Sequence, residues 1–225
     1  MPLPEVLELD EAQIARTVFA ERVKVFTDRA TASAITSPLG TVLLAWLQAP
    51  VTRWKRAAAW LCLINLAELL IVAVGYRFRS AQSRGEDALP WARWMIFAVS
   101  LAGLAWGSTV WFFWTEGQYL YYMLNLLVLV GVVGIDVVIM SPFRSAMTSF
   151  ASGVLLLPML HLALVPNQFG VQIAVGLTVL FVPVTQHSRV AEKQLVEGLE
   201  HAVRNQALAS NLLAERTPWS RPRQN

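Results

Sequence analysis

The residues of this chain best suited to chemistry are a few polar side chains inside long apolar runs. Glu68 is the single charged residue between Arg56 and Arg77, and Asn65 lies three positions before it. Residues three apart lie on one face of a helix, so the amide and the carboxyl point the same way. Facing the interior of a membrane bundle, they could line a ligand pocket or relay a proton. They could equally hydrogen-bond neighbouring helices in a structural role, and both interpretations stay open.

A second group of polar residues is expected toward the outer end of the apolar runs. Asn125 lies in the outer half of its run and His161 near the outer end of the next, so both could converge with Trp111 or Trp114. For Asp136, one loop away from Arg144, we expect a local ion pair or an interface contact instead. The candidate ligand-binding residues are therefore Asn65, Glu68, Trp106, Trp111, Asn125 and His161.

No pattern typical of an active site occurs in the sequence. It contains no Gly-rich phosphate-binding loop, no G-x-S-x-G and no H-E-x-x-H. The three histidines are expected at three different depths, which argues against a bis-histidine haem or metal site. Cys62, the one cysteine, is expected to be a small buried side chain. We expect no catalytic residue, no metal, no cofactor and, without a basic stripe interleaved with aromatics, no nucleic-acid partner.

The elements that must position the candidate residues are membrane-spanning helices. Of the 225 residues, 56% are hydrophobic and 15% are charged, whereas soluble domains carry about 25% charged residues. A helix needs about 20 apolar residues to cross a hydrocarbon core of ~30 Å. Runs of this kind predict six spans, at about 33–49, 57–76, 93–114, 119–140, 143–164 and 169–187. The predicted fold is an all-α, polytopic membrane helical bundle.

The basic residues of the loops predict the orientation of these spans. Lysine and arginine concentrate on the cytoplasmic side of membrane proteins. They occur before span one, between spans two and three, between spans four and five, and after span six, but not in the loops after spans three and five. Only the loop after span one disagrees, with Arg53, Lys55 and Arg56. We therefore expect both termini in the cytoplasm and the basic flanks against anionic lipid headgroups.

Two helices are expected outside the membrane, one at each end of the chain. The apolar residues of 9–30 recur at steps of three and four, which predicts an amphipathic helix at the cytoplasmic interface or on a partner helix. After span six the chain continues without a proline to residue 215, with a weak coiled-coil seam. The seam residues are Leu195, Leu199, Ala202, Gln206, Ala209 and Leu213. The expected regions are 1–31 (N-terminal helix), 32–187 (spans), 188–216 (cytoplasmic helix) and 217–225 (disordered tail).

Small and aromatic residues within the spans predict how the helices pack. Gly103 and Gly107 form a G-x-x-x-G, and Gly131 and Gly134 flatten one face of the next span. We expect these glycines to let helices approach closely within one bundle rather than between protomers. Tryptophans near the span ends predict an aromatic belt at the membrane surface: Trp46, Trp54, Trp60, Trp91, Trp94, Trp111 and Trp114.

The arrangement of these elements resembles a family of sensors. It combines a short amphipathic helix, six spans and a helical exit with Gly103-Leu-Ala-Trp106-Gly107 in span three and Ser141-Pro142 after span four. Together with the arginine-rich loop before span three, this resembles the six-span N-terminal sensory modules of bacterial hybrid histidine kinases and diguanylate cyclases. The resemblance implies a multi-pass protein of the bacterial inner membrane that passes a signal down its exit helix to a kinase or cyclase domain.

Two functions of different class follow as expectations. The first is a sensory input module, a homodimer paired through the seam of the exit helix, that detects a small lipophilic or membrane-derived signal. The second is a non-catalytic accessory or scaffold subunit of a larger membrane complex. His201 on the exit helix lacks the usual surroundings of a phosphoacceptor histidine, so we interpret it as a solvated helix residue.

Overall fold

The protein is a bundle of helices in the computed structural model, which describes residues 11–165 and 170–216. The described residues contain no strand, which confirms the all-α prediction. Six helical stretches are long and apolar enough to cross a membrane. The helices are α1 (Glu11–Gln48), α2 (Trp54–Ser83), α3 (Leu89–Gly107), α4 (Thr109–Phe112), α5 (Tyr119–Ile139), α6 (Arg144–Leu164) and α7 (Gly170–Arg216). The tail predicted at 217–225 lies outside the described residues.

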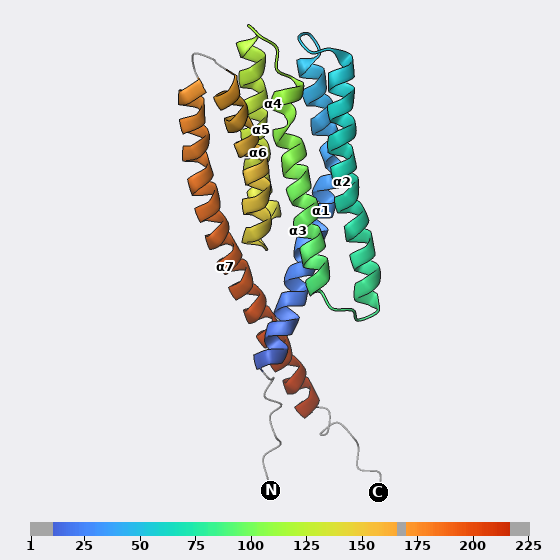
Figure 1. Cartoon of the computed structure of the whole chain (residues 1–225). Coiled ribbons are helices and arrows are strands. Elements are labelled where there is room, and N and C mark those ends of the chain that lie inside the picture. Colours follow the sequence, from blue (N-terminus) through green and yellow to red (C-terminus); the bar gives the residue numbers. More distant parts are fainter. Residues whose placement is uncertain (1–10, 166–169, 217–225) are drawn as a thin grey trace, which may run out of the picture.

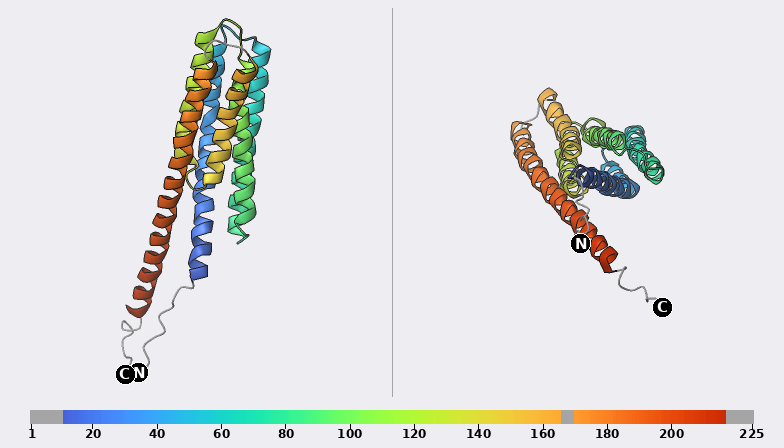
Figure 2. Two further views of the ribbon diagram at one scale, coloured as in Figure 1. Left: turned by 60° about the vertical axis from the view of Figure 1, so that its left-hand side comes forward. Right: turned by 90° about the horizontal axis from the view of Figure 1, so that it is seen from below.

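Two of the helices are much longer than the others and extend beyond the bundle (Figure 1). At about 1.5 Å per residue, the 38 residues of α1 and the 47 of α7 reach about 57 and 70 Å, roughly twice a ~30 Å hydrocarbon core. Their lower parts run beside each other below the remaining helices, and the described chain begins and ends at this same end (Figures 1 and 2). α1 packs against α2, α3, α5 and α7.

The N-terminal helix and the first span are one element rather than two. The prediction of a separate interfacial helix is wrong, because α1 continues without interruption through Thr31, Ser33 and Pro38. Proline is tolerated inside membrane helices where neighbouring helices cover the backbone. Here Ala30 and Ala34 are buried on one side of this stretch. The lower part of α1 packs on α7, which agrees with the predicted alternative that this segment lies on a partner helix.

The closest helix pair is α3 with α6, and glycines make this approach possible. A Cβ added to Gly103 would lie 2.5 Å from the Phe150 carbonyl oxygen, and one added to Gly107 would lie 2.1 Å from that of Gly153. Packing within the bundle is thus confirmed for this G-x-x-x-G. The prediction of close helix packing is wrong for Gly131 and Gly134 of α5, where an added Cβ would meet no described atom within 4 Å.

The third predicted span is interrupted near its outer end. Its helix stops at Gly107 and resumes in α4 after Ser108. The Ala105 carbonyl accepts hydrogen bonds from the Ser108 hydroxyl (2.7 Å) and the Trp60 indole (3.0 Å). A side chain that bonds to backbone carbonyls competes with the helical ladder, which accounts for the break. Trp60 is fully buried, so its assignment to the aromatic belt is wrong.

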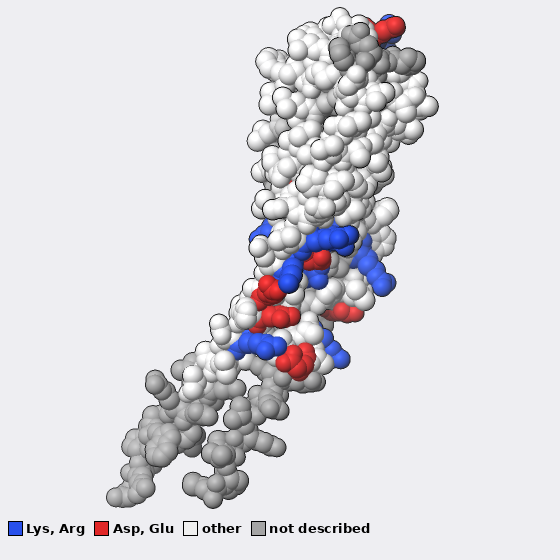
Figure 3. All heavy atoms as spheres, turned by 90° about the vertical axis from the view of Figure 1, so that its left-hand side faces the viewer, with Lys and Arg blue, Asp and Glu red and all other residues white. Residues whose placement is uncertain are grey.

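The surface carries its charges at the two ends of the bundle. Seen from the side of α7, the upper part is almost free of charged residues, and most of the acidic and basic side chains lie in a band below it (Figure 3). Trp46, Trp54 and Trp94 are exposed, as expected for an aromatic belt in contact with lipid. Six apolar helices with lipid-compatible surfaces identify a multi-pass membrane protein.

Candidate functional site

Glu68 is buried inside the bundle, as its position among apolar residues predicts. Only 8% of the residue is exposed, and its Oε1 accepts a hydrogen bond of 2.8 Å from the Ser37 hydroxyl of α1. The Trp106 side chain of α3 also hydrogen-bonds to this carboxyl. Serine and tryptophan donors offset part of the cost of removing a carboxylate from water. Glu68 and Trp106 were both predicted as site residues, whereas Ser37 was not.

Asn65 does not take part in this group. Its amide donates a hydrogen bond of 2.7 Å to the Leu61 carbonyl of the same helix, one turn earlier. The residue is half-buried, since it lies at the edge of the face that carries Glu68. Cys62, a turn before Asn65, is exposed, so the expectation that its side chain is buried is wrong. On a membrane helix such a position faces lipid.

Asp136 of α5 lies at the same cavity as Glu68. The cavity has a volume of about 30 Å³, and both carboxyl residues line it together with Ser33 of α1. Of the two roles expected for Asp136, the local ion pair is wrong, because no described residue forms a hydrogen bond or ion pair with its side chain, and the interface contact stays a prediction. Glu68 and Asp136 lie on spans two and four, with a whole span between them along the chain, so no local pattern predicts that they meet at one cavity.

A cluster of aromatic rings surrounds His161 near the C-terminal end of α6. The imidazole lies 4.8 Å from the Trp111 ring and 4.9 Å from the Trp114 ring, both edge to face, and 6.0 Å from the stacked Tyr122 ring. These rings come from α4, the segment after it, α5 and α6. The predicted convergence of His161 with Trp111 and Trp114 is confirmed. Tyr122 belongs to the same cluster and was not predicted.

Several buried polar atoms in this region have no partner among the described residues. They are Nδ1 of His161, the hydroxyl of Tyr122 and both ends of the Asn125 amide. Asn125 follows Tyr122 by three positions, so the two side chains share one face of α5. A buried polar atom without a hydrogen bond costs about 1–3 kcal/mol. Such atoms in a group indicate bound water or a polar ligand group.

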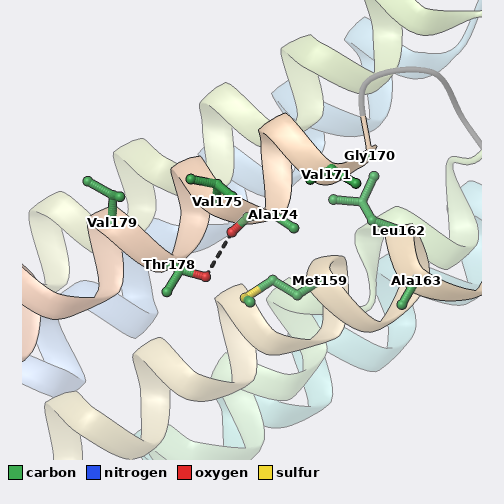
Figure 4. Close-up of a pocket in the computed structure, with 9 residues that line it drawn as sticks. All are labelled: Met159, Leu162, Ala163, Gly170, Val171, Ala174, Val175, Thr178 and Val179. Atoms are coloured by element: carbon green, nitrogen blue, oxygen red, sulfur yellow. Dashed lines mark hydrogen bonds between the residues drawn. The ribbon is translucent and has the colours of Figure 1, made fainter.

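An apolar groove separates the C-terminal part of α6 from the N-terminal part of α7 (Figure 4). Its volume is about 410 Å³, within the range of small-molecule pockets. Met159 and Leu162 extend from α6 toward α7, and the Thr178 hydroxyl bonds to the Ala174 carbonyl of its own helix at 2.8 Å (Figure 4). The groove therefore presents an apolar surface. Its lining is Met159, Leu162, Ala163, Gly170, Val171, Ala174, Val175, Thr178 and Val179.

A charged contact ties α7 to the bundle at the level where the short helices end. The Arg22 guanidinium of α1 forms an ion pair with Glu192 of α7 and donates a hydrogen bond to the Pro142 carbonyl. It also lies over the Phe143 ring, 4.2 Å from the centroid. Glu192 accepts a second hydrogen bond from the Arg144 backbone N–H, at 3.3 Å. Three segments far apart in the sequence thus meet at Arg22.

A second ion pair sets the register between the two long helices. Arg204 of α7 lies 3.2 Å from Glu11 of α1. Glu11 and Arg22 are 11 positions apart on α1, and their partners Arg204 and Glu192 are 12 positions apart on α7. The earlier residue of α1 pairs with the later residue of α7, so the two helices are antiparallel and stay in register. Ile14 and Val18 of α1 are buried in this stretch.

The residues of the predicted seam on the exit helix differ in exposure, and their pairing with a second protomer stays a prediction. Leu195 and Leu199 are half-buried, but Ala202, Gln206 and Ala209 are exposed, whereas Val203 and Ala207 are half-buried. The half-buried positions of α7 therefore recur with a period longer than the 3.5 residues of a coiled coil. The α7 helix packs against α1 of its own chain. The side chain of Leu213 lies outside the described residues.

Within the described residues, no group of three or more His, Cys, Asp or Glu side chains could hold a metal ion. Searches against protein families, curated proteins and solved structures found no match to this chain. The candidate functional features are thus the α6–α7 groove, the His161 cluster, the Glu68–Asp136 cavity and the contact at Arg22.

Proposed function

We propose that this protein is a transmembrane sensory input module for a small lipophilic ligand. The observation that carries the proposal is the position of α7, one uninterrupted helix of 47 residues. Its outer end forms a wall of the apolar groove, and its cytoplasmic part is tied to α1 by two ion pairs. A helix of this kind transmits a displacement from one end to the other, whereas a flexible linker dissipates it.

The groove supplies a route for such a ligand. It lies between two helices at membrane depth and is lined by aliphatic side chains, so a molecule dissolved in the bilayer meets no polar barrier on entry. A ligand shifts a conformational equilibrium only by the difference in its affinity for the two states. A groove whose two walls belong to different helices provides this difference, because its width changes when α7 moves relative to α6.

The output lies in the cytoplasm under this proposal. The loop charges favour placing both termini of the chain in the cytoplasm, with the bundle in the inner membrane of a bacterium. The α7 helix would then present its signal to a kinase or cyclase output domain, either as a rotation or as a change in its pairing with α1. A homodimer remains part of the proposal, with the exposed faces of α7 available for pairing.

Filling the groove should block ligand binding and move α7. Ala174→Phe places a ring between the groove walls, so we expect the affinity for a fluorescent long-chain fatty acid to fall at least tenfold. Spin labels at Gln13→Cys and Gln206→Cys, in a Cys62→Ser background, report the distance between α1 and α7 by electron paramagnetic resonance. The fatty acid should change this distance in the parent chain and leave it unchanged in Ala174→Phe.

Val182→Phe is the matched control, because Val182 is exposed on α7 but does not line the groove. It should bind the probe like the parent chain and show the same change in distance. If the probe binds without any change in the α1–α7 distance, the groove is a lipid site and the sensory proposal fails.

A second candidate, an accessory subunit of a larger membrane complex, is favoured by the exposed valines of α7. Val171, Val175 and Val179 are exposed along the groove, and Val182 and Val190 are exposed further along the helix. A stripe of β-branched residues packs well against another helix. Stable co-purification with a second protein at fixed stoichiometry, together with unchanged α1–α7 distances on adding probe, would favour this candidate.

A further inference from the structure

The Glu68–Asp136 cavity has no role in the mechanism proposed for the groove. Nine of its ten lining residues come from five helices, α1, α2, α3, α5 and α6, and Met140 directly follows α5; the two carboxyls are the only ionisable groups among the ten. The other lining residues are Ala30, Ser33, Ile71, Val99, Ala102, Ile139, Met140 and Phe150. Two acidic residues thus line one small cavity among mostly apolar residues.

The two carboxyl groups differ in how they are partnered. Glu68 accepts hydrogen bonds from Ser37 and Trp106. Asp136 is only 8% exposed, lines the cavity and has no hydrogen-bond or ion-pair partner among the described residues. An ionised carboxylate removed from water without a partner is costly. The unpartnered Asp136 indicates that something which the protein chain does not supply completes the site.

The basic residues of the surrounding helices do not neutralise the cavity. Arg29 lies four positions before Ser33 on α1, but its guanidinium donates to the Val138 carbonyl at 3.1 Å and the Ser141 hydroxyl at 2.9 Å. On α2, Arg79 is paired with Asp28. Arg93 of α3 and Arg144 of α6 each lie six positions before the residue that lines the cavity on their helix, Val99 and Phe150.

From this geometry we infer that the cavity binds one small monovalent cation, a proton or Na⁺, shared between Glu68 and Asp136. Its oxygen atoms, from two carboxyls and the Ser33 hydroxyl, are the hard ligands that such ions prefer. The volume of about 30 Å³ has room for one water molecule. Mg²⁺ retains several waters and Ca²⁺ takes six to eight oxygen ligands, so divalent ions do not fit.

The cation would link two helices that do not pack closely on each other. The two carboxyls come from α2 and α5, which share no direct packing of note. The α1 helix contributes Ser33 to the cavity and the hydrogen bond that Ser37 donates to Glu68. A ligand that binds only the folded state stabilises it by mass action. The site is independent of the groove, so its failure would leave the sensory proposal intact.

Thermal unfolding of the purified full chain tests this inference. At constant ionic strength, NaCl replaces choline chloride at fixed pH, and a second series lowers the pH without Na⁺. A Na⁺ site predicts that the melting temperature rises about 3–5 °C for each tenfold increase in Na⁺ above its dissociation constant. A proton site predicts no response to Na⁺, a rise at lower pH, and an infrared band of a protonated carboxyl that Asp136→Asn removes.

The variants Glu68→Gln and Asp136→Asn keep the side-chain shape and should each abolish the response, whereas Glu86→Gln, an exposed loop carboxyl, should not. If a variant does not fold, the infrared spectrum of the parent chain with and without Na⁺ still decides the matter. The inference is overturned if the parent chain responds to neither cation and shows no protonated carboxyl band. It is also overturned if both variants fold and respond like the parent chain.

Discussion

Gly107→Ala should destabilise the bundle by at least 1–3 kcal/mol, the usual cost of overpacking a tight interface. The added methyl group would lie 2.1 Å from the Gly153 carbonyl oxygen, and backbone atoms cannot rotate away as a flexible side chain can. The α3 and α6 helices would have to separate, which also stretches the hydrogen bond of 2.7 Å between Ser100 and Ser149. Thermal unfolding followed by tryptophan fluorescence should show a drop in melting temperature of roughly 2–4 °C per kcal/mol.

Gly131→Ala and Gly134→Ala are the matched controls for this prediction. Both glycines lie within a membrane helix, but an added Cβ meets no described atom within 4 Å at either position. Alanine is also the better helix former by about 1 kcal/mol, so these variants should be as stable as the parent chain or more so. Equal melting temperatures for Gly107→Ala and Gly131→Ala would contradict the close packing of α3 on α6.

Arg22→Ala should release the lower part of α7 from the bundle. The guanidinium contacts a carboxylate, a backbone carbonyl and an aromatic ring, and hydrogen bonds to charged groups contribute about 1.5–3 kcal/mol each. Both side chains of the ion pair are less than one-third exposed, at 19% and 26%. We therefore expect a loss of about 2–4 kcal/mol, with a coupling energy of roughly 1–3 kcal/mol to Glu192 in a double-mutant cycle.

Two further variants separate charge from geometry at this contact. Arg22→Lys keeps the charge but loses the planar guanidinium, which binds two acceptors and stacks on Phe143, so it should recover less than half of the loss. The Glu21–Lys24 pair is more exposed, at 42% and 44%, and its double-mutant cycle should yield a coupling below ~0.5 kcal/mol. A coupling at Arg22–Glu192 as small as this would mean that α7 is held by apolar packing alone.

The predicted spans match the helices because crossing a membrane leaves little choice of conformation. Inside lipid every backbone amide must be paired within its own segment, so a run of about 20 apolar residues becomes a helix whatever its neighbours are. The starts and ends of α5 and α6 accordingly fall within one residue of the predicted limits. The prediction fails at Ser108, where a hydrogen bond from the distant Trp60 helps to break the helix.

The burial and the contacts of the candidate residues were predicted correctly where the relevant signal is local. A carboxyl in an apolar run must face the interior, and Glu68 does so. His161 meets Trp111 and Trp114 because their expected depths coincide. The local ion pair expected for Asp136 is wrong, since closeness to Arg144 along the chain suggested it, whereas helix packing places Asp136 at the cavity of Glu68.

The sequence by itself determined the class of this protein, its six spans, and the burial of its intramembrane acid Glu68, because the free energy of moving apolar and charged groups between water and lipid depends on residue type and order alone. The tertiary structure decided which helices face one another. It alone joins the lower part of α1 to α7 through Arg22 and Glu192, places Gly107 on Gly153, and brings Glu68 and Asp136 to one cavity. These contacts depend on the shapes and rotations of whole helices, and no periodicity within a single helix specifies its partner.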